Sequence, residues 1–395
     1  MPSVTLTLLN TSEHNRQRQF ELLKEFEARN RISVEVRELQ WESAWTEYSR
    51  YATYGEGPDV AQVGTTWISP LAGMNALRPF TTADLAPIGG PGVFQDSIAR
   101  TGMIGGTIWA VPWLLDTRVI WYWRRALSAA GIPDIGAFEN PERLTDTIAR
   151  LQRAGQPTWA APTTLTWTTL QNLASWIWAA GGDILGPNDA TAVFDQPEAL
   201  SALRAYFGLA RYMAPNMHGL DSVGSDLLFA QRRAAVTMAG PWILDTIAEA
   251  SSTPEALAGL GAAPMPGWSW VGGSSLVVWR RSLQVPAALE LVRFLTGYDA
   301  QIRLARIGNL LPTRLDVLTD PSLTANPLFR ALSTNAQRGR SFPPVKLWGL
   351  VETQLSQALA TVWRDVLADP GADLGPILTR HLGPLARRLS TTLAA

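Results

Sequence analysis

The sequence contains no cysteine among its 395 residues. This absence excludes disulfides, a cysteine nucleophile, and iron–sulfur or cysteine-ligated zinc sites. Histidine is scarce as well, because the chain has only His14, His218 and His381. They lie far apart in the sequence and lack the close spacing of metal ligands. We therefore expect no metal site and no cofactor.

An excess of charge of one sign and long apolar runs are also missing. The 33 basic and 34 acidic residues give a formal net charge of -1. The chain therefore has no electrostatic footprint for nucleic acid or for an anionic membrane surface. No apolar run approaches the ~20 residues of a membrane span. The first residues, MPSVTL, do not read as a signal peptide.

Common enzyme motifs are absent too. The glycines in 89–92 and 102–106 form neither a phosphate loop nor the G-x-G-x-x-G dinucleotide fingerprint, and no G-x-S-x-G elbow occurs. A glycoside hydrolase needs two carboxylates about 5 to 9 Å apart. Glu13, Glu42 and Asp116 are acids that could supply them. This enzyme class is the rival to a binding protein, and labelled oligosaccharides separate the two because a binder returns them intact.

Tryptophan, in contrast, is abundant, with 17 residues. Its ring offers a large flat apolar face and a single N–H donor. The most informative stretch is 105–125, GGTIWAVPWLLDTRVIWYWRR. It predicts one strand over 108–111, which Pro112 should end for lack of an N–H, and a second over 119–123. Between them lie Trp113, Asp116 and Arg118, which suit a polar, ring-shaped ligand or, alternatively, form a buried Asp–Arg pair in a tryptophan-rich core.

The opening of the chain predicts a βαβ unit. Apolar residues alternate over 4–8 and again over 32–39, and a helix that Ser12 can cap lies between these strands. A third strand is expected after Gly57-Pro58-Asp59-Val60. In open α/β sheets ligands lie at the carboxyl ends of the strands. The residues just after these three strands, among them Glu13, Trp41 and Trp67, are therefore candidate ligand contacts.

The stretch 105–125 resembles the segment G-x-x-(Y/W)-A-V-P-W-x-x-D-x-R-x-(L/I)-x-Y of extracellular solute-binding proteins that serve ABC sugar importers, the relatives of maltose-binding protein. Four more segments resemble that family in the same order along the chain. They are GPDV at 57–60, AAVTMAGPW at 234–242, the Gly272-Gly273-Ser274 segment, and GNLLPTR at 308–314. The resemblance covers nearly the whole chain.

The resemblance implies an α/β, two-lobed periplasmic-binding-protein fold of type II, with three hinge crossings and a ligand cleft between the lobes. The expected lobes are 1–111 with 263–311, and 112–262 with 312–395. It also implies a monomer without enzymatic activity that binds a carbohydrate, as a di- or oligosaccharide, and delivers it to transmembrane permease subunits. The implied location is the periplasm or the outer face of the membrane, with or without a lipid anchor. It also implies an export signal, which we do not find at the start of this sequence.

The resemblance and the strand ends together give a set of ligand-binding candidates. Tryptophans would stack on sugar rings, and Glu13, Asp116, Arg118 and Arg314 would supply hydrogen bonds. Trp242 follows a strand end, whereas Trp176 lies inside an element and is expected in the core. The same fold could instead hold a glycerophosphodiester, a polyol or a peptide, and a phosphate would call on Arg118 and Arg314. The candidates are Glu13, Trp41, Thr66, Trp67, Trp113, Asp116, Arg118, Trp167, Trp242, Gly273, Ser274, Arg314 and Trp348.

Overall fold

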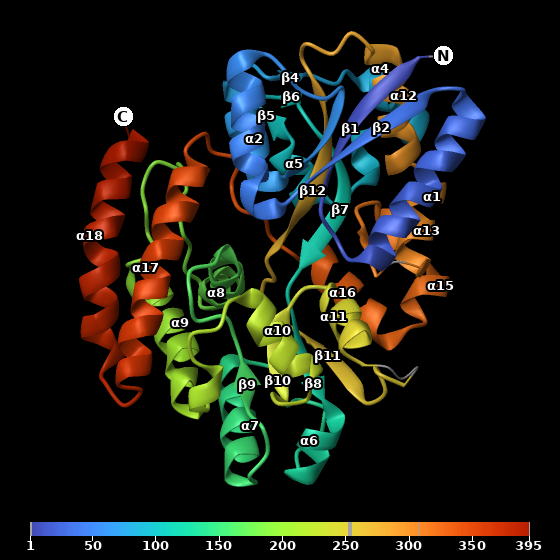
Figure 1. The fold of residues 1–395 in the computed structure, drawn as a ribbon. Helices are drawn as coiled ribbons and strands as arrows, with labels where there is room; N and C mark the ends of the chain where they lie inside the picture. Colours follow the sequence, from blue (N-terminus) through green and yellow to red (C-terminus); the bar gives the residue numbers. More distant parts are fainter. Residues whose placement is uncertain (1, 252–254, 308, 395) are drawn as a thin grey trace. The chain divides into compact units, whose positions relative to one another are not determined.

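The structure is a computed structural model that describes residues 2–251, 255–307 and 309–394. Figure 1 shows the course of the chain and the labels of its elements. The chain divides into two compact units: unit 1 comprises 1–116, 271–333 and 341–349, and unit 2 comprises 117–270, 334–340 and 350–395. Within the described ranges, none of the helices combines the length and the apolar character that crossing a membrane would require.

Unit 1 is built around a seven-stranded sheet. Its strands and those of a separate small hairpin are β1 (Ser3–Leu9), β2 (Ser33–Leu39), β3 (Val60–Gly64), β4 (Leu77–Arg78), β5 (Met103–Ile104), β6 (Thr107–Ile108), β7 (Val111–Thr117), β12 (Val271–Trp279) and β13 (Leu311–Pro312). Its helices are α1 (Glu13–Asn30), α2 (Trp41–Tyr54), α3 (Ile68–Gly73), α4 (Thr82–Leu85), α5 (Asp96–Thr101), α12 (Val285–Thr296), α13 (Tyr298–Ile307), α14 (Leu315–Leu318) and α15 (Pro321–Thr324), with short 3₁₀ turns that include Thr65–Trp67. α16 (Pro327–Gln337) begins in this unit and ends in unit 2.

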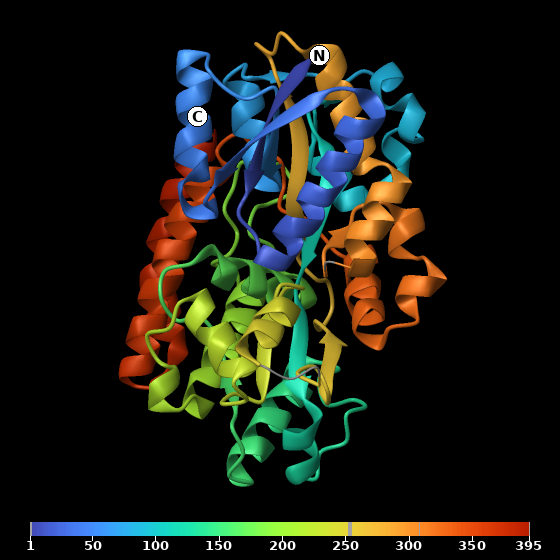
Figure 2. The same ribbon diagram turned by 45° about the vertical axis from the view of Figure 1, so that its right-hand side comes forward.

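The strand order of the unit 1 sheet is β13-β7-β12-β3-β1-β2, with β4 paired to β12. β1 runs parallel to both β2 and β3, so the predicted βαβ opening is confirmed. Helices cover both faces, with α1, α12 and α13 on one side and α2 on the other (Figure 1; Figure 2). The pleat of β12 shows why, because Leu276 and Val278 pack toward α1 and α12 while Val277 and Trp279 pack toward α2.

One prediction about this sheet is wrong. Pro112 does not end a strand but lies inside β7, as its second residue. β13 pairs only with Leu114 and Leu115 of β7, so this ladder makes no demand on the missing N–H of Pro112. The carbonyl of Pro112 is used, since it accepts a hydrogen bond of 3.0 Å from the Thr313 hydroxyl.

Unit 2 contains a four-stranded sheet in the order β11-β8-β10-β9. Its strands are β8 (Val119–Trp123), β9 (Trp159–Ala160), β10 (Val236–Ala239) and β11 (Leu260–Pro264). Its helices are α6 (Arg124–Ala129), α7 (Pro141–Arg153), α8 (Trp167–Ala179), α9 (Pro197–Phe207), α10 (Ser222–Ala230), α11 (Ile243–Ala250) and α18 (Leu374–Ala394), together with α17 (Trp348–Ala368), whose first two residues belong to unit 1. The two C-terminal helices, red in Figures 1 and 2, lie side by side, and His381 of α18 contacts Asp365 of α17 at 2.7 Å.

Aromatic rings form much of the core of unit 2. Trp159, Trp176, Tyr206 and Trp363 are buried, and their ring centroids lie 5.6 to 6.3 Å apart in the contacting pairs. Most of these pairs are edge-to-face, the arrangement that aromatic quadrupoles favour. The prediction that Trp176 belongs to the core is therefore confirmed.

The bounds of the two units differ from the expected lobes. Residues 260–264 span the expected boundary between the lobes at 262/263, but they form β11, which pairs with β8 inside unit 2. β7 continues to Thr117, which moves the first boundary beyond Val111. Residues 312–333 belong to unit 1, where Arg314 bridges to Phe94.

Candidate functional site

Trp242 stands where a strand gives way to a helix. β10 ends at Ala239, Gly240 and Pro241 turn the chain, and α11 begins at Ile243. The indole Nε1–H of Trp242 donates a 2.7 Å hydrogen bond to Oδ2 of Asp226 on α10. The ring is only partly buried, so some of its surface remains open to a ligand.

Arg118 lies against this ring and is not open to solvent. Its guanidinium carbon is 4.7 Å from the centroid of Trp242 and 4.6 Å from that of Trp270, so the cation contacts two indoles. It also donates to the Gln171 side chain and to the carbonyl of Thr117. With 2% of Arg118 exposed, little of this residue is accessible from solvent.

Asp226 is a buried acid, with 7% of the residue exposed. Burial raises the pKa of its carboxyl to about 7, while the Trp242 N–H and the Arg118 charge oppose that rise and Asp221 adds to it. Among the elements packed on α10, β9 and β10 carry no ionisable residue and α11 carries Asp245 and Glu249.

Trp167 is the other exposed candidate of unit 2. It is the first residue of α8, is 41% exposed, and follows the N-cap Thr166. A run of hydroxyls ties this helix start to that of α10, since Ser222 Oγ lies 3.1 Å from Thr166 Oγ1 and 3.0 Å from Thr168 Oγ1. The ring is thus held on a fixed element and remains available for stacking.

In unit 1 the structure brings four candidates to one edge of the sheet. Glu13, Trp41, and Thr66 with Trp67 follow β1, β2 and β3, which are parallel and therefore end at the same edge. The rings of Trp41 and Trp67 lie 5.7 Å apart, and Trp41 Nε1 donates to the carbonyl of Asn10. Both rings are partly exposed. Glu13 is exposed, and its carboxylate accepts a hydrogen bond from the side-chain amide of Gln17.

Gly273 and Ser274 have structural duties in unit 1. Gly273 has φ of +121°, and a Cβ there would lie 2.2 Å from the carbonyl oxygen of Leu114, so this close approach of β12 to β7 requires glycine. Ser274 is buried and its hydroxyl accepts a 2.9 Å hydrogen bond from Gln62. The close approach at Gly273 and the hydrogen bond of Ser274 are therefore contacts within the sheet of unit 1.

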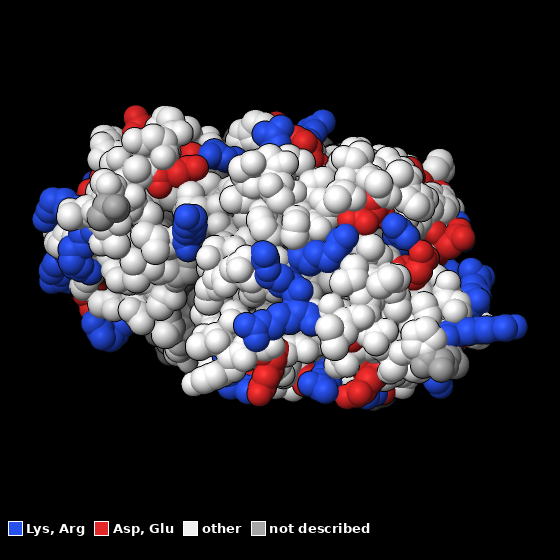
Figure 3. Space-filling view, turned by 90° about the horizontal axis from the view of Figure 1, so that it is seen from above, with Lys and Arg blue, Asp and Glu red and all other residues white. Residues whose placement is uncertain are grey.

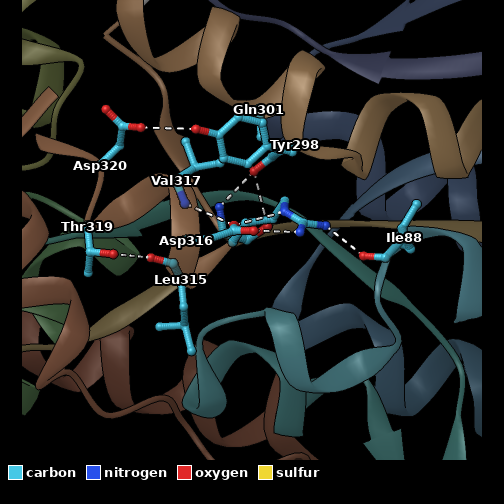
Figure 4. Close-up of polar contacts among 10 residues, drawn as sticks. Ile88, Tyr298, Gln301, Leu315, Asp316, Val317, Thr319 and Asp320 are labelled. Atoms are coloured by element: carbon cyan, nitrogen blue, oxygen red, sulfur yellow. Dashed lines mark hydrogen bonds and ion pairs between the residues drawn. The ribbon is translucent and has the colours of Figure 1, made fainter. Parts of the chain in front are cut away.

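Arg314 is likewise satisfied inside unit 1. Its guanidinium pairs with both carboxylate oxygens of Asp316, at 3.0 and 2.7 Å, and donates to the carbonyl of Ile88 at 2.8 Å. Figure 4 shows Asp316 and Ile88 with these contacts as dashed lines. Gly308, which belongs to the same family-like segment, lies outside the described residues.

Two other predicted residues lie in cores. Trp113 is 1% exposed and packs among the apolar side chains beneath α1 and α12. Trp348 is also buried and stacks on Phe342 with 4.4 Å between ring centroids. Asp116, at the end of β7, is partly buried and remains a candidate.

Sequence reasoning missed the partner of Trp242, which is Asp226, and two partners of Arg118, which are Trp270 and Gln171. These three residues lie on three separate segments and carry no local motif. One signal was present, because Asp226 interrupts an apolar helical stretch in SDLLFA. An acid at a core-facing helix position calls for a specific partner.

The face of the molecule in Figure 3 carries both signs of charge. Blue and red side chains are interspersed there, and most of the visible surface is uncharged. Within the described residues, no three acidic or histidine side chains are grouped so that they could hold a metal ion.

Comparison with known proteins gives the fold and the family. The chain is 22% identical over 346 residues to the diacetylchitobiose binding protein DasA of Streptomyces coelicolor, covering 85% of this chain and 78% of that protein. It superposes on an ABC transporter solute-binding protein of Thermotoga lettingae bound with α-D-tagatose, with a TM-score of 0.85, 22% identity and full coverage of both chains. The superposition on the sugar-binding protein MalE of Xanthomonas citri has a TM-score of 0.83 and 23% identity, and it covers 99% of this chain and 97% of that one.

These likenesses confirm the predicted α/β periplasmic-binding-protein fold. A family model, bacterial extracellular solute-binding protein, matches residues 21–331. The glycoside hydrolase rival is therefore set aside. The chain belongs to the bacterial extracellular solute-binding proteins, which bind solutes for ABC transporters in the periplasm or on the outer surface and are not enzymes.

Proposed function

We propose that this protein binds a carbohydrate, as a di- or oligosaccharide, and delivers it to the permease subunits of an ABC importer. The observation that carries the proposal is Trp242, a partly open indole held at the end of β10 by a hydrogen bond to Asp226 and by stacking on Arg118. Support also comes from relatives whose names state diacetylchitobiose and tagatose as their ligands.

An indole of this kind suits a sugar for a physical reason. A pyranose presents a face of C–H groups that packs on an aromatic ring, while its hydroxyls point outward to polar partners. Trp167 offers a second exposed ring in the same unit. Two separate rings suit a ligand with more than one sugar residue.

Unit 1 would contribute its own contacts. Trp41 and Trp67 supply apolar surface at the edge where the parallel strands end, and Glu13 and Asp116 supply carboxylates for sugar hydroxyls. The cleft between the lobes stays a prediction from the family resemblance. No step of chemistry is involved, so the whole task is selective binding and release.

A phosphate-bearing ligand is the alternative within the same fold, and the arginines argue against it. A phosphate needs several cationic or N–H donors turned toward it. Arg118 lies against the rings of two indoles, and Arg314 is paired with Asp316. The two arginines that were expected to serve such a ligand thus already have partners in the protein.

Titration calorimetry with a ligand panel tests the proposal. The panel contains diacetylchitobiose, maltose, maltotetraose, tagatose, glycerophosphocholine and a tripeptide. We expect saturable binding of at least one di- or oligosaccharide, recovered intact from the complex, and no heat from glycerophosphocholine. Tight binding of glycerophosphocholine or of the tripeptide, with no response to any sugar, would refute the carbohydrate assignment.

A further inference from the structure

We propose that Asp226 is a positioning residue for Trp242: it sets the affinity for the ligand by fixing the indole plane and does not touch the ligand itself. This inference rests on the proposed function, because it takes Trp242 as the ring that the sugar meets. Asp226 is buried on α10, and its carboxylate accepts a 2.7 Å hydrogen bond from Trp242 Nε1.

The first argument concerns the freedom of the indole. A partly exposed tryptophan at a helix start has several rotamers, and ordering it on binding would oppose affinity. A hydrogen bond from the indole edge to a carboxylate is short and charge-assisted. It selects one orientation before the ligand arrives, since Asp226 itself is held in the packed interface of α10 with α11 and β10.

The second argument concerns the cation that lies against the ring. The guanidinium carbon of Arg118 lies 4.7 Å from the Trp242 centroid and 4.6 Å from the Trp270 centroid. The cation covers part of the Trp242 ring, and the residue still remains partly exposed. With its edge held by Asp226 and its face against Arg118, the indole has a defined orientation.

The third argument comes from a second set of the same residue types in this chain. Trp178 Nε1 donates to Asp183 at 3.0 Å, and the Arg340 guanidinium lies 4.9 Å over the Trp178 ring. In that set Arg340 also forms an ion pair with Asp183, and both side chains are partly exposed. Trp178 is buried, so no part of its ring is left for a ligand.

The contrast between the two sets shows what is special about Asp226. Asp183 links Arg340, in the segment 334–340, to the rest of unit 2 through a solvent-accessible ion pair. Asp226 is buried and forms no ion pair within the part of the chain that the structure describes, which costs stability. An amide could accept the same indole N–H without burying a charge. A buried acid that lowers stability, and that accepts its hydrogen bond from a partly exposed ring, is typical of a functional site.

The test compares Asp226→Leu, which removes the acceptor, with Asp226→Asn, which keeps an acceptor oxygen. Asp183→Leu is the matched control, because it removes the same kind of indole partner elsewhere in unit 2. Affinity is measured by calorimetric titration with diacetylchitobiose and with maltose. We expect Asp226→Leu to weaken binding roughly tenfold, Asp226→Asn to stay within about threefold, and Asp183→Leu to bind like the wild type.

A second readout needs no ligand. In protein labelled with 5-fluorotryptophan, the fluorine resonance that disappears in Trp242→Phe belongs to Trp242. We expect this resonance to shift and broaden in Asp226→Leu and to stay in place in Asp183→Leu. An unmoved resonance, or wild-type affinity in Asp226→Leu when Trp242→Ala has lost affinity, would overturn the positioning role. A wild-type protein that binds neither sugar would instead overturn the proposed function, while the resonance would still decide the role of Asp226.

Discussion

The hydroxyl oxygens of Thr117 and Ser269 lie 3.0 Å apart, although 152 residues separate them in the sequence. Both residues belong to unit 2 and stand next to places where the chain passes to unit 1. The side-chain amide of Asn335, on a third such segment, lies 3.0 Å from Thr117 Oγ1 and 2.6 Å from Ser269 Oγ. Three segments at the boundaries of unit 2 are thus joined within that unit by one buried polar cluster.

The first prediction concerns that cluster. Asn335→Ala removes the amide that links Thr117 and Ser269, and it also removes the acceptor of the Met265 N–H. Buried polar groups left without partners are costly, so we expect the free energy of unfolding to fall by about 1–3 kcal/mol. Urea denaturation followed by circular dichroism measures it. Asn216→Ala, an exposed position of the same unit, is the control and should leave the midpoint unchanged; equal midpoints for both variants would contradict the prediction.

The second prediction concerns Gly273. Because a Cβ at this position would lie 2.2 Å from the Leu114 carbonyl oxygen and φ is +121°, Gly273→Ala forces β12 away from β7. We expect a loss of at least about 2 kcal/mol in unfolding free energy. Thermal unfolding by calorimetry provides the measurement. Gly73→Ala, where nothing lies within 4 Å of an added Cβ, should be neutral or slightly stabilising. A Gly273→Ala protein as stable as the control would show that the strands can separate without cost.

Local patterns predicted the elements well, and for a physical reason. Alternation over residues 4–8 reflects the two faces of β1, and the N-cap Ser12 accepts from the Asn15 N–H as its position before the helix suggests. Such signals depend on neighbours in sequence, so they can be read without knowing the fold.

The roles of single side chains were harder to predict, because they depend on partners that are distant in sequence. Nothing near Arg118 in the sequence indicates that the rings of Trp242 and Trp270 will both contact it. Trp113 and Trp348 have the composition of ligand-stacking residues, yet packing buries both. Arg314 is a partial exception, since its partner Asp316 is only two residues away and could have suggested an internal ion pair.

The third prediction concerns the pH dependence of stability through Asp226. Burial raises the pKa of this carboxyl from 3.8 to about 7 in the folded protein. The folded state therefore holds its proton more tightly than the unfolded state. The stability that the protonated Asp226 carboxyl contributes is fully present below about pH 4 and is lost as pH rises through about 7. Asp226→Asn removes this dependence, so its stability relative to the wild type should rise between pH 5 and pH 8, by on the order of 2 kcal/mol.

Urea denaturation of both proteins at several pH values measures that difference. Asp183→Asn provides the control, because Asp183 is partly exposed and paired with Arg340. Its stability relative to the wild type should not follow the same course with pH. If the curves for wild type and Asp226→Asn run parallel from pH 5 to pH 8, Asp226 does not titrate in this range in the folded protein.

The last prediction separates a ligand-binding tryptophan from a core tryptophan in the same unit. Trp242 is partly exposed at the end of β10, whereas Trp176 is buried against Tyr206. Trp242→Ala should weaken binding of diacetylchitobiose or maltose by ~1–3 kcal/mol, since the lost ring area would no longer cover a sugar face. Trp176→Ala should instead lower the unfolding free energy by ~3–5 kcal/mol. Calorimetric titration and urea denaturation of both variants distinguish the two effects. Wild-type affinity in Trp242→Ala would remove this ring from the site, and with it the main support for a carbohydrate ligand.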